Sequence, residues 1–482
     1  MTPLLVQAYD PATFRQQGHA LIDQLADYLE RDQQAGPHPV LPWLAPDALL
    51  ADWEAEADQW GKADLNSFFT KLLANSIHIH HPHYMGHQVS GPAPATALAS
   101  LVSALLNNGM AVYEMGASAT VIERIVIDTL RKAIGFGEQA GGFLTSGGTL
   151  ANLTAMLCAR KQKANEDVWE TGTQHQYAIM VSEEAHYCVE RTVRIMGWGA
   201  AGVIKVPVDD AYQMRTDLLA ACYQQALADG KQVIAVVGSA SSTSTGSYDD
   251  LGAIAAFCQA HGLWFHVDGA HGGAVVFTEK YKNLAQGIHL ADSVVVDFHK
   301  MLMTPALVTG LVFKNGDDSY QTFAQKAQYL WAQTDREWFN LAKRTFECTK
   351  LMMSIKVYVL LRTYGLPLFD DYVTTLYDLG RQFAQLIQQR PQLELAVAPQ
   401  ANIVCFRYLL PDQSVAEANA LNQGIRQAIV ESGRFYIVQT SLRGCVYLRT
   451  TLMNPLTTET ELIKLLDYVE HTALLVAFPQ VA

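Results

Sequence analysis

The sequence lacks several features that mark other classes of protein. No stretch approaches the roughly 18 uncharged apolar residues of a membrane span, and the first residues lack the basic region and apolar run of a secretion signal. Basic residues are outnumbered, 34 against 47 acidic ones, so a net charge of -13 offers no global field for nucleic acid or anionic lipid. The seven cysteines form no C-x-x-C pair, which is typical of reduced thiols. We therefore expect a cytoplasmic protein that binds neither nucleic acid nor membranes.

The composition is that of a folded chain with a helical first part. Of the 482 residues, 50% are apolar and 17% charged, a balance that excludes wholesale disorder. Within residues 1–79, Leu21, Leu25, Tyr28 and Leu29 recur at the spacing of one helix face. Such a short helical arm has little core of its own, so we expect it to pack on another domain or on a partner subunit.

The middle of the chain, residues 80–365, alternates short apolar runs with helix-like segments. The runs are YAIMV (177–181), GVIKV (202–206), VIAVV (233–237), LWFHV (263–267), SVVVD (293–297) and LVFK (311–314). Apolar strands separated by helices indicate a mostly parallel sheet that is covered on both faces. The last part, residues 366–482, has two strand-like runs, NIVCFRYL (402–409) and CVYLRT (445–450), with helix-like stretches before, between and after them. We predict a large α/β domain followed by a small α+β domain.

Two residues at predicted strand ends suggest a cofactor. Asp268 follows LWFHV and Lys300 follows SVVVD. Because ligands of parallel sheets bind beyond the carboxyl ends of the strands, both side chains are expected to point into one crevice. An amine and a carboxylate there suit pyridoxal 5′-phosphate, since Lys300 can form a Schiff base with its aldehyde and Asp268 can keep its ring nitrogen protonated.

Three further segments fit the same ligand. The glycines of LTSGGTLANLTAM (144–156) open a helix, where free N–H groups and the helix dipole favour a phosphate, and Thr149 adds a hydroxyl. His186 lies just beyond the strand YAIMV, where its ring can stack on a flat cofactor or be a satisfied core histidine. The turn GSASSTSTGSYDD (238–250) is rich in hydroxyls and is either a donor set or a plain polar loop.

These motifs carry a resemblance to a known family. SGGTLAN, SEEAHYCVERT, HVDGAHGG and DFHK occur in the order and at the spacings of the group II pyridoxal-phosphate decarboxylases. That family includes the aromatic-amino-acid, glutamate, histidine and diaminobutyrate decarboxylases. The resemblance implies the fold of the aspartate-aminotransferase type (fold type I), a homodimer with the active site at the interface, and an N-terminal arm that clasps the partner. It also implies decarboxylation of an L-amino acid to its amine.

The resemblance also implies roles for individual residues. Lys300 matches the Schiff-base lysine, Asp268 the partner of the ring nitrogen, His186 the stacking histidine, and Ala270 the residue under the opposite ring face. The other matches are Gly148, Thr149 and His299 at the phosphate, Thr243 near the ring hydroxyl, Arg449 at the substrate carboxylate and His87 in the substrate pocket.

The chain departs from the family in ways that leave its product open. Phe298 replaces a common proline before His299, and His271 replaces a common tyrosine. Between Leu330 and Val357 there is no tyrosine to protonate the substrate carbon, only aromatics such as Trp331, Trp338 and Phe339. In that case His186, His271 or water is the acid, or the enzyme performs oxidative deamination to an aldehyde. A third alternative is a non-catalytic relative that binds the cofactor, which the intact Lys300, Asp268, His186 and Arg449 argue against.

The histidine run HIHHPHYMGH (78–87) invites a metal site. No cysteine, aspartate or glutamate supports it within the run, so we predict no metal. The substrate stays open among aromatic, acidic and diamino acids, because half of the expected pocket belongs to a partner subunit.

Overall fold

The computed structural model describes residues 1–57, 60–61, 64–323 and 338–478. The chain divides into two compact units. The larger one, here called the large unit, comprises Gln88–Ala384 and Val397–Val404, and the small unit comprises Met1–His87, Gln385–Ala396 and Cys405–Ala482. The three domains predicted above, 1–79, 80–365 and 366–482, stay a prediction.

The large unit is built on a seven-stranded sheet in the order β1-β7-β6-β5-β4-β2-β3. The strands are β1 (Gly141–Thr145), β2 (Gln176–Ser182), β3 (Val203–Val206), β4 (Lys231–Ser239), β5 (Trp264–Asp268), β6 (Ser293–Asp297) and β7 (Thr309–Phe313). Only β7 runs against its neighbours, so the predicted mostly parallel sheet is confirmed. Every residue of β5, β6 and β7 is buried, which requires cover on both faces and explains their continuous apolar runs.

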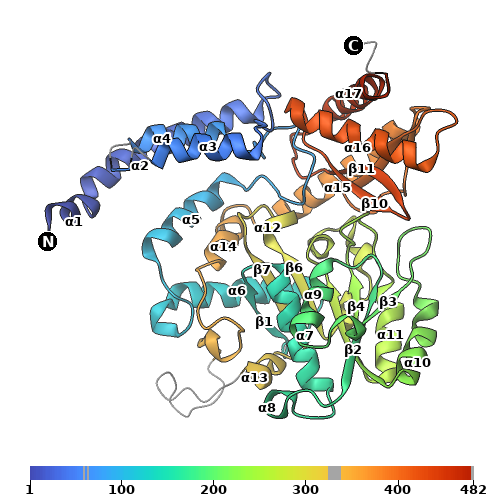
Figure 1. Cartoon of the computed structure of the whole chain (residues 1–482). Coiled ribbons are helices and arrows are strands. Elements are labelled where there is room, and N and C mark those ends of the chain that lie inside the picture. The colour runs from blue at the N-terminus through green and yellow to red at the C-terminus, as the bar shows by residue number, and fades with distance from the viewer. Residues whose placement is uncertain (58–59, 62–63, 324–337, 479–482) are drawn as a thin grey trace. The chain divides into compact units, whose positions relative to one another are not determined.

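Helices surround this sheet (Figure 1). They are α5 (Pro94–Leu106), α6 (Ala117–Ile134), α7 (Gly148–Lys163), α8 (Val168–Thr171), α9 (Tyr187–Ile195), α10 (Leu219–Ala228), α11 (Leu251–His261), α12 (Phe298–Met301), α13 (Asp317–Phe323), α14 (Ser354–Thr363) and most of α15 (Pro367–Gln388). α7 packs on the central strands β4 to β7, and nine consecutive residues from Ala151 to Ala159 are buried. This burial holds the first turn of α7 rigidly at one edge of the sheet.

The small unit contains the N-terminal helices α1 (Pro3–Ala8), α2 (Pro11–Gln33), α3 (Pro46–Ala57) and α4 (Leu65–Ala74), together with α16 (Val415–Ser432) and α17 (Glu459–Ala477). Its sheet has the order β10-β11-β9-β8, from β8 (Leu393–Leu395), β9 (Ile403–Tyr408, of which Cys405 onward belongs to this unit), β10 (Val438–Leu442) and β11 (Cys445–Thr451). Ser414 and Glu417 form a capping box that starts α16, and Gly433 ends it at a φ of 68°.

Sequence patterns missed three strands. β1, β8 and β10 are short or carry glycine and polar residues, and tertiary pairing rather than their own pattern makes them strands. Each of the seven cysteines is a free thiol. Within the described ranges, no helix combines the length and the apolar character that crossing a membrane requires.

The sheet brings the carboxyl ends of its central strands together. Ser239 at the end of β4 pairs with Asp268 at the end of β5, and Asp268 pairs with Val295 of β6. Asp297 ends β6, and α12 with Lys300 follows at once. This edge is where ligands of open α/β sheets bind.

Candidate active site

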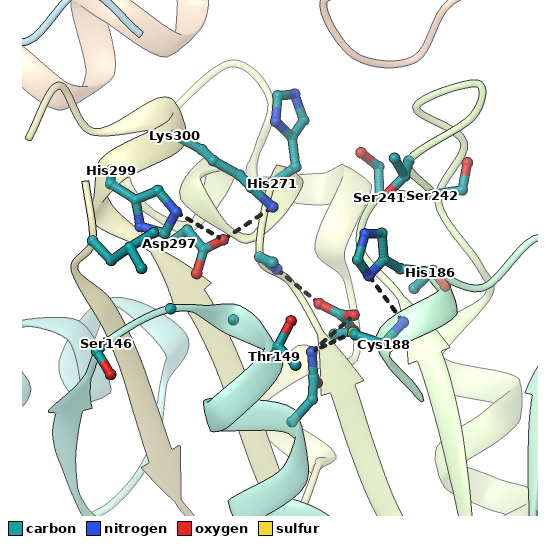
Figure 2. Close-up of a pocket in the computed structure, with 18 residues that line it drawn as sticks. Ser146, Thr149, His186, Cys188, Ser241, Ser242, His271, Asp297, His299 and Lys300 are labelled. Carbon is teal, nitrogen blue, oxygen red and sulfur yellow. Dashed lines mark hydrogen bonds and ion pairs between the residues drawn. The ribbon is translucent and has the colours of Figure 1, made fainter. Parts of the chain in front are cut away.

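One cavity at this edge gathers the predicted cofactor residues of the large unit (Figure 2). Its volume is about 300 Å³, within the range of small-molecule sites. The predicted residues that line it are Gly148, Thr149, His186, Thr243, Asp268, Ala270, His299 and Lys300. Their roles toward a cofactor stay predictions, but their convergence from five separate segments of sequence is a property of the fold.

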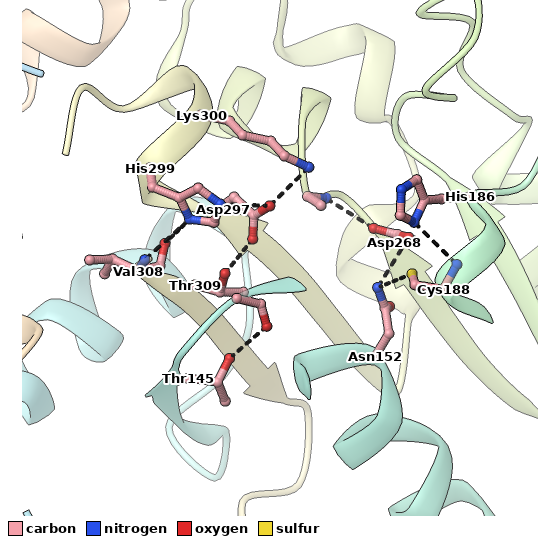
Figure 3. A network of polar contacts seen from close by, with 12 residues as sticks. Thr145, Asn152, His186, Cys188, Asp268, Asp297, His299, Lys300, Val308 and Thr309 are labelled. Carbon is pink, nitrogen blue, oxygen red and sulfur yellow. Dashed lines mark hydrogen bonds and ion pairs between the residues drawn. The ribbon is translucent and has the colours of Figure 1, made fainter. Parts of the chain in front are cut away.

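Lys300 is held by a carboxylate that the sequence analysis did not single out. Its Nζ lies 3.0 Å from Oδ2 of Asp297, a side chain with 1% exposure, and Thr309 Oγ1 donates to the other oxygen, Oδ1 (Figure 3). Burial alone would lower the pKa of Lys300, but Asp297 and Asp268 outweigh it and hold that pKa above its ordinary value. Burial would raise the pKa of Asp297, and Lys300 with His299 reverses this, so that pKa lies below its usual range. The two groups therefore form an ion pair between a buried carboxylate and a partly buried amine.

Asp268 has a different set of partners. The backbone N–H of Ala270 donates to its Oδ1 at 3.2 Å, and Nδ2 of Asn152 donates to its Oδ2 at 3.2 Å. The same Nδ2 lies 3.4 Å from the sulfur of Cys188. Figure 3 shows this group of contacts beside the Asp297 group, with Lys300 turned toward Asp297. Asp268 is thus oriented by neutral donors and reaches the cavity as an acceptor.

Two aromatic side chains border the same space. His186 caps α9, since its Nδ1 accepts the N–H of Cys188 at 3.3 Å, and burial lowers the pKa of His186 despite the nearby charge of Asp268. Its ring and the Lys300 side chain approach the cavity from different sides (Figure 2). His271, the departure noted above, also lines the cavity, and its Nε2 lies 2.8 Å from Oδ1 of Asn402. A flat, neutral imidazole at 186 is suited to stacking on a ring.

The first turn of α7 forms an anion cradle. Ala151 N donates to Gly147 O at 3.2 Å, so the N–H groups of the preceding helical residues have no partner within the helix. Gly147 adopts a φ of 114°, which favours glycine. A Cβ at Gly148 would lie 3.3 Å from both carboxylate oxygens of Asp297 and 3.6 Å from the Cβ of Ala270. Glycine therefore keeps the backbone open to a ligand.

Hydroxyl groups complete this cradle. Thr149, Ser241, Ser242 and Thr243 all line the cavity, and Ser241 Oγ is buried with no hydrogen-bond partner among the described residues. An unsatisfied buried hydroxyl aimed at a cavity suits a ligand oxygen. Among the described residues that line the cavity, Lys300 is the sole lysine and there is no arginine. The cradle, the hydroxyls, the amine and the acceptor at Asp268 fit a phosphorylated pyridine aldehyde.

The two predicted substrate residues belong to the small unit. Arg449 lies on β11 with 6% exposure, and burial lowers its pKa. The ring of His87 lies 5.9 Å from that of Tyr436, and partial burial near the charges of Arg449 and Arg426 lowers its pKa. Their roles in substrate binding stay predictions.

The histidine run serves the structure of the small unit. His78 Nδ1 lies 3.1 Å from Oδ2 of Asp32, a fully buried carboxylate, and His38 Nε2 lies 3.2 Å from its Oδ1. Across the described ranges, no group of three or more histidine, cysteine or acidic side chains is arranged to hold a metal ion.

Of the loop aromatics, Phe339 packs against Trp338 and Tyr113, whereas Trp331 lies outside the described residues.

Several site residues were missed although a signal existed. Asp297 precedes Lys300 by three positions, the spacing of neighbours on a helix. Asn152 lies one helical turn after Gly148, on the same face of α7. His266 precedes Asp268 by two positions, so both side chains lie on one face of β5. The periodicity was readable, but which partner each side chain meets depends on tertiary packing.

Known proteins share this sequence and fold. A family model described as pyridoxal-dependent decarboxylase conserved domain matches residues 47–409. The chain is 30% identical over 375 residues to an L-aspartate decarboxylase of Metarhizium robertsii, covering 77% of this chain and 75% of that one. It is 26% identical over 480 residues to an aromatic-L-amino-acid decarboxylase of Bacillus atrophaeus, covering 97% of each.

The crystal structure of mouse CSAD has a TM-score of 0.90 with this chain at 22% identity, covering 96% of this chain and 99% of that one, which shows a shared fold. The family match spans most of the chain and includes the whole cavity. This chain therefore belongs to the pyridoxal-dependent decarboxylase family and is a pyridoxal-phosphate-dependent amino-acid decarboxylase of fold type I.

Proposed function

We propose that this enzyme converts an L-amino acid to the corresponding amine and carbon dioxide, with Lys300 as the covalent attachment point of the cofactor. The observation that carries the proposal is the convergence of the Lys300 amine, the Asp268 carboxylate and the α7 cradle on one cavity. When bound, pyridoxal phosphate supplies an electron sink for the pair released as the carboxylate leaves.

The residues of the cavity divide the work of binding. The first-turn N–H groups of α7 with Thr149 and His299 would bind the phosphate, because an unpaired helix N-terminus favours an anion. Thr243 would donate to the ring hydroxyl, and His186 and Ala270 would hold the ring between them. Asp268 would accept the N–H of the ring nitrogen, a contact between opposite charges that a low-dielectric site strengthens.

In this proposal the groups that transfer protons are side chains that line the cavity. The amine of Lys300 carries a proton readily because Asp297 and Asp268 hold its pKa above the ordinary value. His186, with a pKa lowered by burial, is neutral near pH 7 and binds through its ring rather than its charge. In this proposal Lys300 or His271 delivers the proton to the substrate carbon, so the product is the amine.

Substrate recognition is assigned to Arg449 and His87. Arg449 binds the substrate carboxylate, since a buried guanidinium is a strong partner for a carboxylate, and His87 contacts the side chain. Relatives named for aspartate and for aromatic amino acids match this chain about equally well, so both classes, with diamino acids, belong in the test.

Product analysis tests the proposal. The purified protein is incubated with pyridoxal phosphate and each common L-amino acid, carbon dioxide release is measured, and the product is identified by mass spectrometry. We expect an amine from one substrate class. An aldehyde with consumption of oxygen and release of peroxide would replace the amine reaction by oxidative deamination. A protein that binds the cofactor and releases no carbon dioxide from any amino acid would be a non-catalytic relative.

In this proposal the enzyme is a homodimer of two copies of this chain, with the active site at their interface. On α5, the side chains of Leu98, Leu101, Val102 and Leu105 are between 47% and 68% exposed. An apolar helix face of this extent is typical of a subunit contact. Leu101→Asp with Leu105→Asp is expected to yield monomers in sedimentation experiments, with loss of activity. Dimers of unchanged stability in this variant would contradict the placement of the interface.

A further inference from the structure

A continuous chain of buried hydrogen bonds lies behind Asp268, away from the cavity. Trp264 Nε1 lies 2.9 Å from Ser293 Oγ, which lies 2.8 Å from His266 Nδ1. His266 Nε2 lies 2.7 Å from Asn152 Oδ1, and Asn152 Nδ2 lies 3.2 Å from Asp268 Oδ2. All five side chains are at most 9% exposed. Solvent therefore does not interrupt the chain.

The fold builds this chain from three elements. Trp264, His266 and Asp268 alternate along β5 and so share one face of the sheet. Ser293 begins β6, which pairs with β5 through His266 and Ser293. Asn152 projects from α7, which packs on these strands. The spacing that makes β5 a strand thus also places every second side chain in one polar line within an apolar core.

The chemistry of its two ends fixes the direction of the chain. An ionised carboxylate only accepts, so Asn152 must turn its NH₂ toward Asp268 and its carbonyl oxygen toward His266. That oxygen requires an N–H at Nε2 of His266. At the other end the indole of Trp264 only donates, so Ser293 accepts from it and has its own hydrogen available for Nδ1 of His266. Every group donates toward Asp268.

The protonation state of His266 agrees with this direction. The ring is fully buried, and burial lowers its pKa to about 4, more than the charge of Asp268 raises it. The imidazole is therefore neutral near pH 7, with one N–H and one acceptor nitrogen. Hydrogen bonds aligned in one direction polarise one another, which strengthens the last bond in the line.

We propose that His266 and Asn152 are positioning residues that hold the Asp268 carboxylate in the orientation that receives the ring nitrogen of the cofactor. This inference rests on the proposed role of Asp268. Asn152 holds the carboxylate directly, and His266 keeps the amide of Asn152 from turning over. Ser293 and Trp264 in turn fix the tautomer of His266. Effects on the cofactor should decline in the order Asn152, His266, Ser293.

The first experiment determines the tautomer of His266 in the wild-type protein. In ¹⁵N NMR spectra of wild-type protein with labelled histidine, one buried ring is expected in the Nε2–H tautomer, without titration from about pH 5 to 8. Assignment uses the signal that disappears in His266→Phe, or that shifts in Ser293→Ala if the first variant does not fold. An Nδ1–H tautomer for His266 would reverse the direction of the chain and overturn the inference.

The second experiment measures cofactor affinity. Cofactor-free wild type, Asn152→Leu, His266→Phe and Ser293→Ala are titrated with pyridoxal phosphate and with an analogue in which C–H replaces the ring nitrogen. For pyridoxal phosphate we expect the Kd to rise about thirtyfold, tenfold and threefold in these three variants, the range for lost buried hydrogen bonds. For the analogue the Kd should change by less than about twofold, because Asp268 has no ring N–H to receive.

The outcomes separate this inference from the proposed function. Tyr248→Phe is the matched control. It removes a buried hydroxyl that bonds to Gly272 O and Tyr377 but takes no part in the line of hydrogen bonds that ends at Asp268, so it should change neither Kd. If the variants lose as much affinity for the analogue as for pyridoxal phosphate, then His266 and Asn152 only support the structure of the site. That result would overturn their positioning role and leave the role of Asp268 intact. A wild type without preference for pyridoxal phosphate over the analogue would overturn the role of Asp268 itself, and this inference with it.

Discussion

Asp268 and Asp297 are buried carboxylates in one cavity with opposite kinds of partner. Asp268 accepts from two neutral N–H groups, of Ala270 and Asn152, whereas Asp297 pairs with the cation of Lys300 and the hydroxyl of Thr309. A buried charge needs either a counter-ion or several hydrogen bonds. A carboxylate held by neutral donors can still pair with an incoming cation, whereas one that already has a counter-ion is neutralised.

The two environments follow from what succeeds each strand. After β5, Asp268 is followed by the turn that begins with Gly269 and Ala270, so backbone N–H groups are close to it. After β6, Asp297 is followed at once by α12, which places Lys300 one helical turn away. The same residue type at neighbouring strand ends thus acquires different chemistry from the first few residues beyond it.

Removal of the shared cation should have the largest effect. In Lys300→Ala we expect release of carbon dioxide to fall by about a thousandfold, since the attachment point and a proton carrier are lost together. After borohydride reduction of wild type, peptide mass spectrometry should locate the cofactor on Lys300. The exposed Lys314→Ala is the control and should retain activity. Label on another lysine, or full turnover by Lys300→Ala, would refute the assignment.

Neutralising each carboxylate separately tests the comparison itself. Asp268→Asn should lower kcat by about a hundredfold with the cofactor still attached, because an amide cannot stabilise the charged ring nitrogen. Asp297→Asn should lower kcat by about tenfold, since its loss alters Lys300 rather than the ring. Steady-state kinetics with saturating cofactor measure both values. Equal losses would mean that the two carboxylates act as one charge.

The sequence predicted one of these carboxylates and missed the other for a physical reason. Asp268 stands out because it follows an apolar strand at an edge where ligands bind, and the same reasoning predicted Lys300 and His186. Asp297 ends a strand in the same way, but its role as the partner of Lys300 depends on the distance to Lys300 Nζ. The short helix α12 sets that distance. Asn152 and His266 likewise could not be predicted from the sequence, because the packing of α7 against β5 brings them together. Patterns predict elements and edges, whereas side-chain pairing requires the packed structure.

Amine reactivity in cofactor-free protein should sharpen the contrast. The pKa of Lys300 is raised by Asp297 first and Asp268 second, against the effect of burial. Removing Asp297 therefore lowers that pKa, which increases the fraction of neutral, reactive amine at a given pH. We expect the pH profile for labelling Lys300 with an amine-reactive reagent to move to lower pH in Asp297→Asn, and to move less in Asp268→Asn. A larger shift of the pH profile in Asp268→Asn than in Asp297→Asn would mean that Asp268, and not Asp297, is the main partner of Lys300.

Loss of a single hydroxyl should have the smallest effect and act on one carboxylate alone. Thr309→Val removes the donor to Asp297 Oδ1, so the free energy of unfolding should fall by about 1 kcal/mol at pH 7. Because the folded pKa of Asp297 is depressed, its stabilisation is present above the unfolded value of about 3.9 and is lost as pH falls through the folded pKa.

The deficit of Thr309→Val relative to wild type should therefore narrow in urea denaturation measured from pH 7 down to about pH 3. The matched control is Thr154→Val, whose buried hydroxyl donates to the neutral carbonyl of Leu150 at 2.8 Å. Its deficit should be the same at every pH, since no titrating group is involved. A constant deficit in Thr309→Val as well would mean that Thr309 stabilises the packing rather than the charge of Asp297, and that the ion pair with Lys300 alone distinguishes this carboxylate from Asp268.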